Sequence, residues 1–81
     1  MKRQWRRDVS VPGRWNVQSI ILRTRYTEDV RVSVTLTQSE VGEVPTKTRA
    51  VFDSILDVLD YADELDADLR AEGWERVTPR R

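Results

Sequence analysis

Carboxylates dominate the residues of this chain that could do chemistry. The stretch DSILDVLDYADELDADLRAE, residues 53–72, contains eight carboxylates and one arginine, although the whole protein has no net charge. Pairs such as Asp53/Asp57 or Asp60/Glu64 could in principle hold Mg²⁺ or Ca²⁺. An exposed helix, however, lacks the loop carbonyls and ordered geometry that these ions need. We therefore predict no metal site.

The chain offers few other groups for catalysis. It has no His and no Cys, which removes the commonest general base, the usual nucleophile–base pairs and nearly all zinc sites. No phosphate-binding loop, glycine-rich fingerprint or calcium loop occurs, so no nucleotide cofactor is indicated. We predict a protein that is not an enzyme and that uses no cofactor.

The charges are divided along the chain. Residues 1–52 hold ten Lys or Arg against five acids, and residues 53–81 hold four against nine. Twelve of the fourteen basic residues are Arg, which suits bidentate contacts to phosphate or carboxylate, although a GC-rich genome produces the same bias. The molecule is expected to be electrically bipolar.

Three segments have the alternation of β-strands. WNVQSIILRTRYT places Ile20 and Leu22 in one phase and Trp15 and Val17 in the other, which predicts a strand with a bulge near residue 18 or 19. TKTRAVF, residues 46–52, predicts another strand. Between them VRVSVTLTQ alternates cleanly and places four residues inward: Val30, Val32, Val34 and Leu36.

The acidic stretch has the period of an amphipathic helix. Asp53 or Ser54 can cap its start, and Gly73 suits a left-handed residue at its end. Trp74 is expected to fold back onto the last turn, before a short strand in WERVT. One stripe of this helix is apolar and is predicted to face the core, with Leu59 near its centre. The residues of the stripe are Ile55, Val58, Leu59, Ala62, Leu65 and Leu69.

These elements predict a small two-layer α+β fold. An antiparallel sheet of three to four strands carries one long amphipathic helix on one face, in the order β-β-β-α-β. Residues 1–14 are expected to form a flexible basic arm, residues 15–78 the single domain, and residues 79–81 a basic end. No apolar run approaches the length of a membrane span, so we expect a cytoplasmic protein without a membrane partner.

The outer face of the sheet is the first candidate binding surface. If residues 27–29 form a short hairpin loop, Arg25 lies opposite Arg31 and Arg23 opposite Ser33. An anion over these cations would relieve the repulsion between like charges, although the alternative is an ordinary solvated face. The predicted face has no exposed aromatic residue for base stacking. Its candidate nucleic-acid contacts are Arg23, Arg25, Arg31, Lys47 and Arg49.

The N-terminal arm extends this hypothesis. In MKRQWRR, Trp5 lies among basic residues, a pattern that fits a contact to DNA or RNA but also a disordered solubilising tail. The candidate contacts in the arm are Lys2, Arg3, Arg6 and Arg7. The sequence thus favours a small non-catalytic module that binds a nucleic-acid backbone.

The outward side of the helix supports an alternative function. Five spaced carboxylates could imitate a nucleic-acid backbone and occupy a basic protein surface, as in a short regulator or inhibitor of the kind that phages and mobile elements carry. Solvated charge opposite a core stripe is the simpler interpretation, and head-to-tail homo-oligomers are a third. The five are Asp53, Asp57, Asp60, Glu64 and Asp68.

One carboxylate does not fit the outward face. Asp66 falls within the apolar stripe, between Ala62 and Leu69. A buried carboxylate without a partner is costly, so we predict that Asp66 is partly buried and paired with an Arg or with backbone N–H groups. Arg70, one turn further on, is the local candidate.

Overall fold

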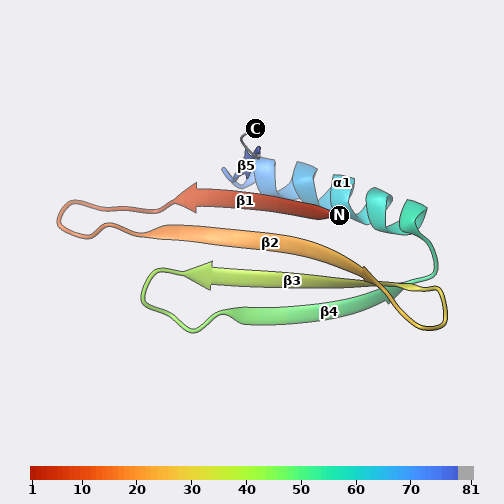
Figure 1. The fold of residues 1–81 in the computed structure, drawn as a ribbon. Helices are drawn as coiled ribbons and strands as arrows, with labels where there is room; N and C mark the ends of the chain where they lie inside the picture. Colours follow the sequence, from red (N-terminus) through yellow and green to blue (C-terminus); the bar gives the residue numbers. More distant parts are fainter. Residues whose placement is uncertain (79–81) are drawn as a thin grey trace.

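The computed structural model describes residues 1–78, which form a five-stranded antiparallel sheet with one helix packed on one face (Figure 1). The strands lie in the order β4-β3-β2-β1-β5. The predicted α+β class is confirmed, with one strand more than expected. The basic end predicted for residues 79–81 lies outside the described residues. The elements are β1 (Lys2–Asp8), β2 (Val17–Tyr26), β3 (Val32–Glu40), β4 (Thr46–Phe52), α1 (Ile55–Ala71) and β5 (Glu75–Val77).

The additional strand is β1, in the segment for which a flexible arm was predicted. It pairs with β2 along its whole length and with β5 on its other side, so it is an interior strand. Trp5 explains this placement, because its indole is completely buried against the helix. A basic segment with a single apolar residue shows little hydrophobic periodicity, and the prediction of an arm over residues 1–14 is wrong for this reason.

The core lies between α1 and the helix-facing side of the sheet. Val58, Ala62 and Leu69 form the buried stripe of the helix. Leu59, predicted near the centre of the core, is only half-buried and lies at the edge of this stripe. The buried cluster comprises Trp5, Ile20, Leu22, Val32, Val34, Val58, Ala62, Leu69 and Trp74.

Two details of the predicted strands are corrected. β2 pairs without interruption on both sides, so it contains no bulge. The two phases exist because Ile20 and Leu22 face the helix, whereas Val17 faces the opposite side. Val30, predicted to point inward, lies in the β2–β3 turn with a φ of 64° and is 77% exposed, because β3 begins only at Val32.

The ends of the helix follow the sequence signals. The Ser54 hydroxyl accepts a hydrogen bond from the Asp57 backbone N–H, as an N-cap should. Gly73 has a φ of 90° after the last turn, and the Trp74 N–H then donates to the Leu69 carbonyl at 2.9 Å. This turn brings Trp74 into the core and leads directly into β5.

Asp66 connects the helix to β1. Its Oδ1 accepts a hydrogen bond from Trp5 Nε1 at 2.8 Å, and its Oδ2 lies 3.0 Å from Arg70 Nε. The side chain is 19% exposed, so the prediction of a partly buried, paired carboxylate is confirmed. The bond from Trp5, aided by Arg70, holds the pKa of Asp66 below its ordinary value of 3.8 despite the opposing effect of burial.

Substitutions on the two sides of the helix should separate core from surface. Leu69→Ala should lower the free energy of unfolding by about 2 to 5 kcal/mol, because Leu69 is buried in the core. Leu56→Ala makes the same change at a position that is 69% exposed, and it should cost less than about 0.5 kcal/mol. Urea denaturation measures both. Equal losses of unfolding free energy would mean that a different side of the helix faces the sheet.

The contribution of Asp66 should depend on pH in a defined direction. Because the pKa of Asp66 is lowered on folding, its ionised form stabilises the protein above about pH 3.8, and this contribution is lost as the pH falls through the folded value. Wild type should therefore exceed Asp66→Asn in unfolding free energy by about 1 kcal/mol at pH 7, and the difference should shrink below pH 3.8. Asp68→Asn, at an exposed position, is the control. A difference that persists unchanged at acid pH would contradict this assignment.

Candidate functional site

The side of the sheet away from α1, which we call the open face, is not covered by any helix or strand within residues 1–78. Trp5, Ile20 and Leu22 are buried on the helix side, and alternation directs the intervening residues to the open face. Six basic side chains lie there, together with two carboxylates, Asp8 and Glu75. The six are Lys2, Arg6, Arg23, Arg25, Lys47 and Arg49.

The cations gather in one cross-strand row. Lys2 pairs with Arg23, Arg23 with Thr35, and Thr35 with Arg49, so four neighbouring strands present cation, cation, hydroxyl and cation. Strand spacing of about 4.8 Å places Lys2 and Arg23 within a Debye length of each other at physiological salt, and Arg49 lies two strands from Arg23. Arg25 follows Arg23 on the same side of β2. This arrangement concentrates positive potential on the open face.

None of these six cations forms an ion pair within residues 1–78. Among residues 1–78, ion pairs form only at Arg3, Arg31 and Arg70, none of which belongs to the six. Of the two carboxylates on the face, Asp8 accepts a hydrogen bond from the Ser10 N–H, and Glu75 lies opposite Arg6 in the sheet. The row of cations around Arg23 therefore has no counter-charge in the described chain.

Four of the predicted sheet cations share the open face, but the fifth does not join them. The loop is longer than expected, so Arg25 lies opposite Ser33 and Arg23 opposite Thr35. Arg31 precedes β3, and its Nε lies 3.6 Å from Asp29 and 3.7 Å from Asp53. The expected pairing of Arg25 with Arg31 is wrong, because the observed partner of Arg25 lies two residues further along the chain.

The cations predicted in the arm divide between the two faces. Lys2 and Arg6 lie on the open face, as β-strand alternation requires. Arg3 donates to Asp63 at 2.9 Å on the helix side. The Arg7 guanidinium lies 4.7 Å from the Trp74 ring and donates to Gln18. Arg3 and Arg7 are thus structural residues that flank Trp5.

Trp15 adds an aromatic surface that the sequence analysis missed. Its side chain is 70% exposed, whereas Trp5 and Trp74 are buried. It lines a shallow hollow of about 440 Å³ at the end of the open face, and the lining also includes Arg6, Val17, Ser19, Ser39, Glu40 and Val41. The available signal was its phase, because Trp15 and Val17 both fall opposite to the core residues of β2. The expectation of an open face without an exposed aromatic residue is therefore wrong.

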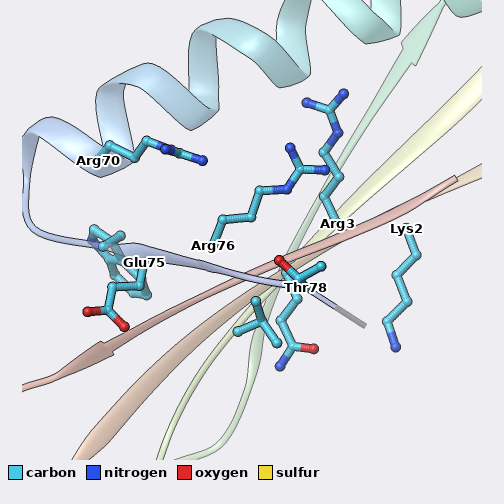
Figure 2. Close-up of a pocket in the computed structure, with 9 residues that line it drawn as sticks. Lys2, Arg3, Arg70, Glu75, Arg76 and Thr78 are labelled. Carbon is cyan, nitrogen blue, oxygen red and sulfur yellow. The ribbon is translucent and has the colours of Figure 1, made fainter. Parts of the chain in front are cut away.

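A second, larger groove of about 790 Å³ runs along β5 and the start of β1. Figure 2 shows Arg3, Arg70 and Arg76 on its helix side, with Lys2 and Glu75 pointing the other way. Arg3 pairs with Asp63 and Arg70 with Asp66, so the helix already supplies counter-charge there. The groove is therefore a weaker anion site than the open face.

The acidic residues of the helix form a separate surface. All five predicted members are exposed on the described chain. Among residues 1–78, only Asp53 of these five makes an ion pair, with Arg31. Residues 57, 60, 64 and 68 on α1, with residue 53 just before the helix, are the exposed acidic residues that we call the acidic ridge, and the open face lies on the side of the sheet away from α1.

No protein-family model, curated protein or solved structure matches the chain. Within residues 1–78, no helix has the length and apolar content needed to span a membrane. The same residues place no group of three acids where they could hold a metal ion. The open face is the best-defined candidate site in the described part of the protein.

Repulsion between the cations of the open face should lower the free energy of unfolding by a measurable amount. Arg23→Thr should leave the unfolding free energy unchanged or raise it by about 0.2 to 1 kcal/mol at low salt, because Lys2 lies directly opposite. High salt should remove the gain by screening. Arg49→Thr is the matched control, since its partner Thr35 is neutral. A loss of more than about 1 kcal/mol at Arg23 would indicate that this residue is structural.

Proposed function

We propose that the protein is a small non-catalytic module that binds the phosphate backbone of a nucleic acid on its open face. The observation that carries this proposal is the set of six basic side chains on one uncovered sheet face, with no ion pair to any of them within residues 1–78. Phosphate contacts by Arg and Lys supply most non-specific affinity for nucleic acids. A positively charged surface of this kind is suited to binding a polyanion.

Neutral donors support the same proposal. β3 presents three hydroxyls beside these cations: Ser33 is opposite Arg25, Thr35 is opposite both Arg23 and Arg49, and Thr37 is opposite Lys47. Hydroxyl groups commonly donate to phosphate oxygens and fix the position of a backbone without reading its sequence. We therefore expect weak dependence on base sequence.

The acidic ridge would influence how the protein is oriented toward a nucleic acid. Because it lies on the outer side of α1, it would face away from a bound polyanion, and the resulting dipole would orient the encounter. The ridge also carries the rival proposal, a regulator that binds a basic protein partner through the helix. The two proposals place the essential residues on opposite sides of the molecule.

Charge reversal should distinguish them. Arg23→Glu with Arg25→Glu should weaken binding to a labelled oligonucleotide by at least about tenfold and reduce the salt dependence, because phosphate contacts are lost. Wild type should bind at micromolar levels or weaker at physiological salt, with log affinity falling linearly with log salt. Titration at two or more salt concentrations measures both quantities.

Neutralising the acidic ridge is the matched control. Replacing Asp57, Asp60, Glu64 and Asp68 by Asn or Gln should leave nucleic-acid binding intact or strengthen it, since distant repulsion is removed. Absence of binding to any DNA or RNA at low salt would overturn the proposal. Loss of a basic protein partner by the ridge variant alone would support the rival.

A further inference from the structure

We infer that the bound nucleic acid is single-stranded, and that one of its bases stacks on Trp15 in the hollow at the end of the open face. This inference rests on the proposed function and adds the substrate class. An indole that is 70% exposed is a large apolar surface in water, and it lies beside a basic side chain, Arg6, on the same face. Base stacking on exposed aromatic side chains is the common way in which single strands are held.

The lining of the hollow fits a nucleobase. Trp15, Val17 and Val41 offer apolar surface, and the hydroxyls of Ser19 and Ser39 offer donors and acceptors for a base edge. The hollow also contains one carboxylate, Glu40, which accepts a hydrogen bond from the side-chain amide of Asn16. A flat ring with polar edges is therefore better matched to this hollow than a phosphate alone.

The hollow and the row of cations lie on the same face of the sheet. Arg6 is opposite Ser19 in the sheet, and Lys2 is opposite Arg23 four residues further along both strands. That separation corresponds to about 13 Å along the sheet. A few nucleotides of extended strand could place phosphates over Lys2 and Arg23 while a base lies on Trp15.

A duplex is expected to use this surface less well. Its bases are paired and stacked on each other, so a base can reach Trp15 only after it is unstacked, at a cost of a few kcal/mol. A single strand exposes its bases without that cost. The geometry therefore predicts that a single strand binds more tightly than a duplex of equal length, although the duplex carries more phosphates.

The test compares Trp15→Ala with wild type on three ligands: a labelled oligothymidylate of about a dozen nucleotides, a duplex of the same length, and inorganic polyphosphate, which has no bases. We expect Trp15→Ala to weaken oligothymidylate binding about 5- to 150-fold and to leave polyphosphate binding unchanged. Trp15→Phe should recover part of the loss. Tyr26→Ala, which removes an aromatic side chain that is 67% exposed outside the hollow, should change nothing.

The outcomes separate the two levels of the proposal. If Trp15→Ala binds oligothymidylate as wild type does, or if wild type binds the duplex as tightly as the single strand, the inference is overturned while the phosphate-binding face stands. If wild type binds neither oligothymidylate nor polyphosphate, the proposed function is overturned together with the inference. Circular dichroism and melting of each variant verify that it is folded, as expected for a position this exposed.

Discussion

The hydrogen bond from the Trp5 indole to Asp66 is the contact on which the rest of the structure depends. It joins β1, in the interior of the sheet, to the helix at a separation of 61 residues, and Arg70 completes the environment of the carboxylate. Without this bond, both the indole N–H and the carboxylate would be left in a largely dry position, which is costly for each. The pairing therefore favours one position of α1 on the sheet.

The division of the basic residues between the two faces of the sheet follows from that position of the helix. Once Trp5 points to the helix, β-strand alternation sends Arg3 and Arg7 to the same side and Lys2 and Arg6 to the other. Arg3 then meets Asp63 on the helix, and Arg7 stacks on Trp74. The two remaining cations join those of β2 and β4 on the open face. One buried aromatic residue thus determines which basic residues are structural and which stay available to a ligand.

The sequence predicted well where hydrophobic periodicity was strong. The alternation from Val32 to Leu36, the Ser54 cap and the Gly73 turn all appear as expected. β1 could not be predicted because Arg stems and a single Trp replace the usual apolar alternation, and its pairing with β2 and β5 is a tertiary effect. The same limit applies to Asp66, whose burial was predictable from its position in the apolar stripe although its donor, Trp5, was not. Leu59 was predicted near the centre of the core but lies at its edge. The rotational position of the helix was therefore predicted only to within about one residue, which is the difference between a central and an edge position.

The central claim is that the open face, and not the helix, holds a polyanion. The most direct measurement is an NMR titration of isotope-labelled protein with oligothymidylate, following the Arg Nε–H and Trp Nε1–H signals. We expect the signals of Arg23, Arg25, Arg49 and Trp15 to shift with ligand. Those of Arg3, Arg7 and Trp5, on the helix side, should stay in place. Shifts confined to the helix side, or none at all in low salt, would contradict the account.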